Sequence, residues 1–267
     1  PQRFLVTRVS VFWQVTFVRL MDELRNNLII DGGFMRYFRL LIGGFALLGA
    51  QLSFSDTPMG VYYQMQVSDP GAVVAAMSEF QNSETAKDRK VTVTLKQIIS
   101  NGTNPATHAV SVLYQSAAHM DSSRAALAQS KDWAKMQRAM SSVTTSVSES
   151  VFRSTGITGG SADNITSKNP VHRYISMNVR DPGKYVEAWE KLQSSRPGEN
   201  GASTIIQVMA AGDMGITHVV SISANSMADL MSGNQNDAAW REFLASVRDI
   251  RDVVDDAIVV DLMAWGA

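Results

Sequence analysis

Two of the chain's four histidines occur in the same local pattern, Thr-His-x-Val-Ser. His108 lies in the segment THAVS, and His218 lies in the segment THVVS in the second half of the chain. Because an imidazole titrates at about pH 6.5, two such groups facing one cavity would suit proton transfer. Each histidine shares its strand face with valines, so packing of that face under helices would make the ring a structural residue at the start of a strand. We favour this structural role and keep proton transfer as the alternative.

The same repetition pairs other polar and aromatic side chains. Gln97 matches Gln207 in the alignment that matches the two histidines, and Tyr62 matches Tyr174 in an equivalent alignment further upstream. A polar side chain on a strand face can donate to a ligand, although an amide bound to solvent or backbone is the commoner outcome. These four residues join the two histidines as candidate ligand-binding residues. The sequence singles out no catalytic residue.

Several kinds of chemistry have no motif in this sequence. It contains no cysteine, no Gly-x-Ser-x-Gly elbow, no His-Glu-x-x-His pair and no cluster of His, Asp and Glu with metal-ligand spacing. We therefore expect no metal site and no cofactor. Residues 1–55 hold six arginines against three acidic residues, so the remainder of a chain with net charge −1 is mildly acidic. This balance argues against a nucleic-acid partner, which requires a concentrated basic face.

Carboxylates gather in the segment VRDIRDVVDDAIVVD, residues 247–261. Arg248 and Asp252 stand at positions i and i+4, as do Arg251 and Asp255, and this is the spacing of ion pairs along a helix. The spacing favours a solvated ion-pair face over an acid–base pair. A closing strand is expected over residues 257–265.

The segment from residue 35 to residue 55 has the layout of a secretory signal peptide. Two arginines follow Met35, and an apolar run from Leu40 to Ala50 precedes small polar residues. The run is shorter than the roughly 20 residues of a membrane-spanning helix, so we expect no stable anchor after cleavage. We expect a periplasmic or secreted protein, with residues 1–34 an upstream extension or fragment outside the fold.

The remainder of the chain is an internal duplication. The segment 62–80 matches 174–192 through Tyr, Met, Val and Asp-Pro-Gly, and 94–111 matches 204–221 with seven identities and no gap. A third pair of segments, 133–151 and 240–258, shares a Trp and the apolar spacing after it. Three blocks in one order indicate tandem repeats over residues 56–155 and 171–267. The Gly/Ser/Thr/Asn-rich stretch between them, 156–170, is predicted to be a linker.

Each repeat predicts the same order of elements. Residues 61–67 and 173–179 alternate in polarity as half-buried strands, and the Asp-Pro-Gly after each one is typical of a capped helix start. Two strands joined by a turn-rich segment follow, at 91–99 with 107–114 and at 203–209 with 217–223. A second helical region and a last strand complete each copy. The predicted order is β-α-β-β-α-β.

This order is the ferredoxin-like arrangement of an α+β fold. Two such units in tandem resemble the dimeric α+β barrel superfamily, in which two sheets close on each other. The resemblance implies a pseudo-dimeric barrel within one chain, and we therefore expect a monomer. The superfamily includes cofactor-free monooxygenases of aromatic substrates, haem-handling enzymes, small isomerases and proteins without known chemistry, so the fold leaves the function open.

Two classes of function follow from these observations. We favour an exported, non-enzymatic module that binds a small apolar molecule or a partner protein. The alternative is a cofactor-independent monooxygenase or isomerase, or a haem-associated enzyme, that uses the barrel lumen. A lumen filled with side chains would favour the first class, and a cavity with convergent polar groups would favour the second.

Overall fold

The structure, a computed structural model, describes residues 57–195, 201–232 and 237–266. The extension 1–34 and the predicted signal segment 35–55 lie outside the described residues, so export stays a prediction. Among the residues described, no helix has the length and apolar character needed to cross a membrane.

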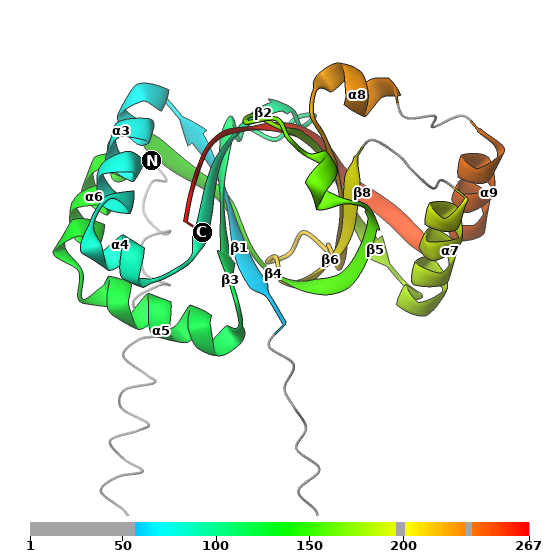
Figure 1. Cartoon of the computed structure of the whole chain (residues 1–267), viewed down its shortest axis with the longest axis horizontal. Helices are drawn as coiled ribbons and strands as arrows, with labels where there is room; N and C mark the ends of the chain where they lie inside the picture. The colour runs from blue at the N-terminus through cyan, green and yellow to red at the C-terminus, as the bar shows by residue number, and fades with distance from the viewer. Residues whose placement is uncertain (1–56, 196–200, 233–236, 267) are drawn as a thin grey trace, which may run out of the picture. The chain divides into compact units, whose positions relative to one another are not determined.

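Eight antiparallel strands form a closed barrel (Figure 1), in the order β1-β3-β2-β8-β5-β7-β6-β4. The first repeat supplies β1 (Met59–Val67), β2 (Thr92–Ser100), β3 (His108–Tyr114) and β4 (Thr144–Gly160), and the second supplies β5 (Val171–Val179), β6 (Ala202–Ala210), β7 (His218–Ala224) and β8 (Arg251–Trp265). Each repeat is thus a four-stranded unit, and the two units join where β2 pairs with β8 and β4 with β6. The predicted duplication and pseudo-dimeric α+β barrel are confirmed.

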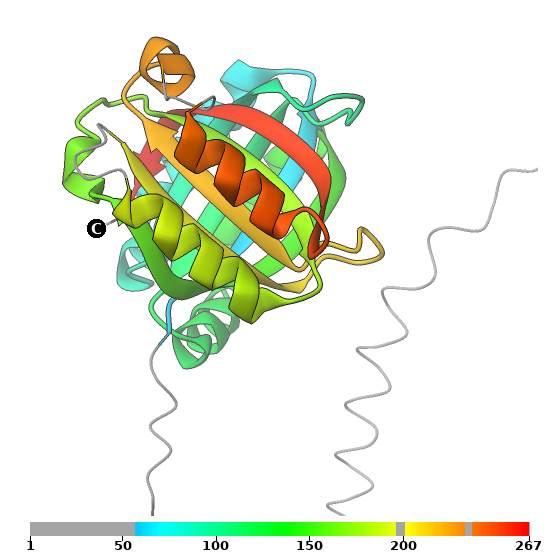
Figure 2. The same cartoon turned by 90° about the vertical axis from the view of Figure 1, so that its right-hand side faces the viewer.

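Helices cover the outer face of each sheet. The first repeat carries α3 (Pro70–Gln81), α4 (Glu84–Asp88), α5 (Ala117–Ala128) and α6 (Lys131–Ser141), and the second carries α7 (Pro182–Ser194), α8 (Met227–Ser232) and α9 (Ala238–Val247), with a 3-10 turn, η1 (Ala162–Asn164), between the repeats. Figure 1 shows the two helical groups on opposite sides of the barrel. In Figure 2, α7 and α9 lie across the outside of the second sheet.

The first helix of each repeat begins for the same local reason. The side chain of Asp69 accepts a hydrogen bond from the Ala72 amide at 3.0 Å, and Asp181 accepts one from the Lys184 amide at 3.1 Å. A proline follows each aspartate, where its missing N–H leaves no unsatisfied donor. These caps fix the direction in which each helix returns across its sheet.

Strand alternation divides the side chains between two environments. The outward-facing residues of the first sheet, such as Val61, Leu95 and Val110, pack with Val73 and Met77 of α3. The corresponding cluster in the second repeat contains large aromatic side chains from α7 and α9: Tyr185, Trp189 and Phe243. The inward-facing residues of all eight strands meet in the lumen.

Two sequence-based predictions are wrong at strand ends. Residues 156–160, predicted to begin a linker, continue β4 and pair with β6 from Thr158↔Thr204 to Gly160↔Ala202. A glycine-rich segment is typical of a linker, but here two of the glycines, Gly156 and Gly160, provide the positive φ angles of an irregular strand. Only residues 161–170 are left to connect the repeats.

The second wrong prediction is the helical ion-pair face at 247–261. Residues 251–265 form β8, so Arg251 and Asp255 do not lie on one helical turn. The carboxylates of this strand find partners on β5 and just after it: Asp256 binds Arg173, and Asp252 binds Arg180. Alternation along β8 also directs some carboxylates into the barrel.

We predict that two glycines of β4 respond differently to alanine. Both have φ in the left-handed region, +75° at Gly156 and +65° at Gly160, but a Cβ on Gly160 would meet the Gly201 carbonyl oxygen at 2.1 Å whereas one on Gly156 meets nothing within 4 Å. Gly156→Ala is expected to lower the free energy of unfolding by about 1 kcal/mol, and Gly160→Ala by more than about 2 kcal/mol. Thermal melts measure both. Equal, parent-like melting of the two variants would contradict the strand assignment of 156–160.

Candidate functional site

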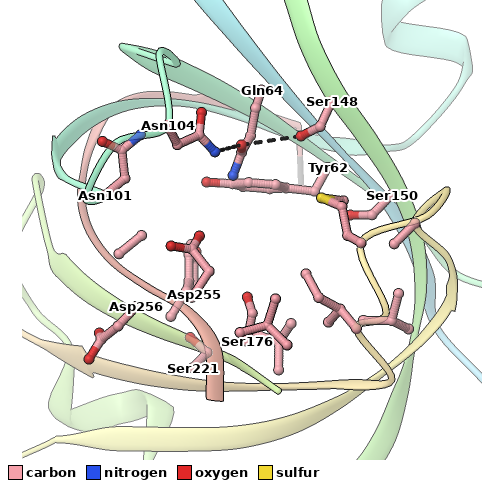
Figure 3. Close-up of a pocket in the computed structure, with 18 of the residues that line it drawn as sticks. Tyr62, Gln64, Asn101, Asn104, Ser148, Ser150, Ser176, Ser221, Asp255 and Asp256 are labelled. Atoms are coloured by element: carbon pink, nitrogen blue, oxygen red, sulfur yellow. Dashed lines mark hydrogen bonds between the residues drawn. The ribbon is translucent and has the colours of Figure 1, made fainter. Parts of the chain in front are cut away.

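The barrel encloses a cavity of about 880 Å³. Its polar lining comes from inward positions on both sheets and from the loop between β2 and β3 (Figure 3), and includes Tyr62, Gln64, Asn101, Asn104, Ser148, Ser150, Ser176, Ser221 and Asp255. An apolar group completes the wall: Leu113, Phe152, Ile206, Val208, Met214, Ile216 and Val219. The size and the mainly apolar lining with a few polar groups are typical of small-molecule sites.

Two tyrosines from equivalent positions meet in the lumen. The rings of Tyr62 on β1 and Tyr174 on β5 lie edge to face, with centroids 5.8 Å apart. Burial raises the pKa of both hydroxyls well above the ordinary value of 10.0, and nearby carboxylates raise it further. Both phenols therefore stay protonated at neutral pH and are available as hydrogen-bond donors.

The amide of Gln64 is held in one orientation. Its Oε1 accepts a hydrogen bond from Asn104 Nδ2 at 2.8 Å and another from Ser148 Oγ at 3.2 Å. Asn104 is itself fixed, because its Oδ1 accepts from the Ala106 amide at 3.0 Å. With its oxygen occupied, Gln64 presents its Nε2 hydrogens as donors from the cavity wall (Figure 3).

Asp255 supplies a carboxylate to the opposite side of the cavity. Figure 3 shows its side chain pointing inward from β8, whereas that of Asp256 points away. Asp256 lies at the rim of the cavity, where its carboxylate accepts hydrogen bonds from Arg173 Nε at 2.9 Å and Arg173 Nη2 at 2.5 Å. Among the described residues, Asp255 has no ion-pair partner. Burial, together with the charge of Asp256, raises the pKa of Asp255 above the ordinary 3.8 against an opposing backbone hydrogen bond.

Deeper in the barrel, a buried charge network joins the repeats. Lys96 on β2 forms an ion pair with Asp261 on β8, and His172 Nε2 lies 3.1 Å from the same carboxylate oxygen. His172 also contacts Ser223 Oγ through Nδ1 at 2.7 Å and stacks on the Tyr174 ring. Burial lowers the pKa of Lys96, partly offset by Asp261. Burial alone would raise the pKa of Asp261, but His172 and Lys96 outweigh it and hold that pKa below 3.8.

The six candidate ligand-binding residues do not come together. Tyr62 and Tyr174 line the cavity. His108 and His218 lie on the helix-facing sides of β3 and β7, in register with Met65 and Met177, and the Nδ1 of each is 3.0 Å from the Oγ1 of the preceding threonine. Gln97 is exposed and pairs with His108 across β2 and β3. Gln207 accepts a hydrogen bond from Arg153 at 2.6 Å.

Sequence reasoning missed most of the polar groups that do line the lumen. Gln64, Lys96, His172, Asp255 and Asp261 all alternate in phase with Tyr62 or Tyr174 once the strand registers are known. Their repeat partners differ in type; Gln64, for example, aligns with Ser176 when Tyr62 is aligned with Tyr174. A search for positions where the two copies diverge on one strand face would have found them.

Comparison with known proteins identifies the fold alone. No family model matches the sequence. No curated protein matches it. Among solved structures, a monooxygenase candidate from Fusobacterium nucleatum is 8% identical with a TM-score of 0.55, covering 79% of this chain and 94% of its own. A monooxygenase candidate from Lactobacillus acidophilus is 12% identical with a TM-score of 0.51, covering 79% of this chain and 96% of its own. An anthrone oxidase-like protein is 12% identical with a TM-score of 0.51, covering 80% and 94%.

These likenesses correct the function favoured from the sequence. A non-enzymatic binding module was the main expectation, but two neighbours that share the barrel are named as monooxygenase candidates and a third as anthrone oxidase-like. The lumen is also a cavity with a few polar groups in a mainly apolar lining, and is not filled with side chains. Both findings favour the enzymatic alternative.

Haem does not fit this cavity. The described lining offers no imidazole to an axial position. Its tyrosines have raised pKa values, which disfavours the phenolate that would bind iron. No group of three or more His, Asp or Glu suited to a metal ion occurs among the described residues.

We predict that the ion pair of Lys96 and Asp261 responds to single and double substitution in opposite ways. Lys96 has a side chain only 6% exposed, so Asp261→Asn leaves a buried ammonium without a counter-ion and is expected to lower the free energy of unfolding by about 3 kcal/mol. Replacing both residues, as Lys96→Met with Asp261→Leu, should restore part of the lost stability, and the remaining deficit of about 1–2 kcal/mol reflects His172 Nε2, which loses its contact with Asp261. Denaturant unfolding measures both; a double variant less stable than Asp261→Asn would refute the assignment.

We predict that His108 and His218 stabilise the fold in their neutral forms. Burial lowers the pKa of each ring below the ordinary 6.5, so the unfolded chain binds protons that the folded chain resists. Stability is therefore present above about pH 6.5 and is lost as the pH falls below it. Replacing either histidine by alanine should cost about 1–3 kcal/mol at pH 7.5 and flatten the pH dependence.

The control for the two histidines is Thr107→Val, followed by denaturant unfolding at pH 7.5 and 5.5. This variant removes the hydroxyl that contacts His108 and accepts from the Val67 amide, but keeps both histidine rings, so it should lower stability at both pH values and keep most of the parent's pH dependence. Alanine variants that keep the parent's full pH dependence would show that the rings do not titrate with folding.

Proposed function

We propose that this protein is a cofactor-independent oxygenase or oxidase that takes a proton from a flat aromatic substrate in the barrel lumen. The observation that carries the proposal is the arrangement around one cavity of the Asp255 carboxylate and the donors on Gln64 and Tyr62. The enzyme names of the structural neighbours support the same class of chemistry.

The lining defines the class of substrate. An apolar wall of branched side chains and Phe152 suits a fused aromatic body, while the donors on β1 suit an oxygen substituent at one edge. An aromatic ketone with an acidic methylene group has both features. Deprotonation places negative charge on the ketone oxygen, where donors stabilise it more strongly than they stabilise the neutral ketone.

Asp255, Gln64 and Tyr62 have separate roles in this reaction. Asp255 accepts the methylene proton, and its raised pKa brings it closer to the strength needed of a base near neutral pH. Gln64 Nε2 and the Tyr62 hydroxyl donate to the enolate oxygen. The electron-rich enolate then reacts with O2 directly: one oxygen atom becomes a new carbonyl on the former methylene carbon, and the other leaves as water with the two methylene hydrogens. The apolar wall reduces the contact of the enolate with bulk water.

We predict that the chain oxidises anthrone with O2 in the absence of any added cofactor. Asp255→Asn is expected to lower kcat/KM at least about 100-fold, since it removes the base, and Gln64→Leu about 10- to 100-fold. Asp256→Asn is the matched control, because its carboxylate is bound to Arg173 and points away from the cavity. Oxygen consumption and quinone absorbance measure the rate.

The pH dependence of kcat/KM in the parent tests whether Asp255 acts as the base. Activity requires the Asp255 carboxylate, so kcat/KM should rise with pH through one ionisation above the ordinary carboxyl value of 3.8. The Asp255→Asn variant should lack this ionisation. Equal loss of activity in Asp255→Asn and Asp256→Asn, or oxidation that needs added flavin or haem, would contradict the proposal.

A further inference from the structure

A second cavity lies outside the barrel, under the helices of the first repeat. It measures about 720 Å³ and lies between the outer face of the first sheet and α3, α5 and α6. Its apolar lining is rich in flexible and aromatic side chains: Met65, Met77, Phe80, Leu127, Trp133, Met136 and Met140. Methionine-rich walls adapt to elongated or irregular apolar ligands.

The second repeat fills the corresponding space with its own side chains. In the alignment of the two copies, Met77 of α3 corresponds to Trp189 of α7, and Met136 of α6 corresponds to Phe243 of α9. Trp189 and Phe243 are 2% and 3% exposed and pack edge to face with centroids 5.8 Å apart. At these two positions the second copy has aromatic rings where the first has methionines, and the space beside Met77 and Met136 is part of the cavity. The first copy has rings of its own in the lining, Tyr63, Phe80 and Tyr114, where the second has smaller side chains.

A buried arginine, Arg89, lines one part of this cavity. Arg89 is only 6% exposed, and its Nε donates to Ser123 Oγ at 2.6 Å. Burial lowers the pKa of Arg89, and a hydrogen bond with Tyr114 partly offsets this effect. Among the described residues, no carboxylate lies within ion-pair distance of its guanidinium. Because a buried charge without a counter-ion is costly, a bound anion would stabilise this arrangement.

The other polar groups at this cavity leave a positive balance. Arg124 and Glu149 line it as exposed residues, and Glu149 does not form an ion pair with Arg89. Tyr63 and Tyr114 add two hydroxyls, and burial raises the pKa of Tyr63 to about 12, so this phenol is a neutral donor. One buried arginine, one exposed arginine and one exposed glutamate give a net charge that suits a single anionic group.

We propose that this cavity binds an amphipathic monoanion, specifically a long-chain carboxylate, with its carboxylate against Arg89 and its chain along the methionines of α3 and α6. A guanidinium binds a carboxylate through parallel hydrogen bonds, and the apolar walls bury the chain. The site lies on the opposite face of the first sheet from the lumen, and the two linings share Gln64 alone among the described residues. The binding proposed here does not depend on the function proposed for the lumen.

The test is a titration of the full chain with a fluorescent undecanoic acid derivative and with the alcohol of the same chain length. The parent is expected to bind the carboxylate saturably and at least 10-fold more tightly than the alcohol. Arg89→Met should weaken carboxylate binding at least 10-fold and alcohol binding less than 3-fold. Arg138→Met, which removes an exposed arginine from α6, is the matched control and should bind like the parent.

A second variant keeps the test informative should Arg89→Met fail to fold. Met77→Trp places in α3 the side chain that occupies this position in α7, and should weaken both ligands at least 10-fold by filling the cavity. Oxidation of anthrone in the lumen should be unchanged in this variant, so failure of either proposal can be recognised separately. The inference is overturned if the parent binds neither ligand, if Met77→Trp binds both as tightly as the parent, or if the site takes up haem in preference to the carboxylate.

Discussion

Closure of the strand ladder is the constraint on which the rest of the molecule depends. Because β2 pairs with β8 and β4 with β6, neither sheet has a free edge, and the inner face of every strand points to one enclosed space. A charge buried on an inner face can then find a counter-ion only within the barrel. Lys96 and Asp261 do so across the β2–β8 junction, with His172 beside them, so this network ties the two repeats together from inside.

Duplication supplied the architecture, and divergence between the copies supplied the sites. In the lumen, the first repeat contributes the amide of Gln64 and the second contributes the carboxylate of Asp255, at positions where the other copy has serine. Outside the barrel the relation is reversed: the second repeat fills its interior with Trp189 and Phe243, and the first keeps a cavity. Pairs that stayed identical occupy both kinds of position: the two histidines lie at equivalent structural positions outside the cavity, whereas Tyr62 and Tyr174 both line it.

Local chemistry made much of the fold predictable. The Asp-Pro-Gly caps and the alternation around Tyr62 and Tyr174 predicted elements that the structure contains, and the repeat predicted their order. Strand ends were harder, since the glycines of 156–160 are also typical of a linker and the charges of 247–261 fit a helical spacing equally well. The site was harder still: alternation shows which residues share a face, but only the packing of helices decides which face is inside. That choice brings Gln64 into the cavity and leaves His108 outside it.

In the proposed reaction, the protein removes a proton from carbon in the lumen before oxygen takes part. The most direct measurement is the exchange of the methylene hydrogens of anthrone with deuterated water, followed by NMR without oxygen in the presence of the protein. We expect exchange well above the rate in buffer with the parent protein, loss of this exchange in Asp255→Asn, and exchange like the parent's in Asp256→Asn. Exchange no faster than in buffer, or unchanged by Asp255→Asn, would contradict the proposed reaction.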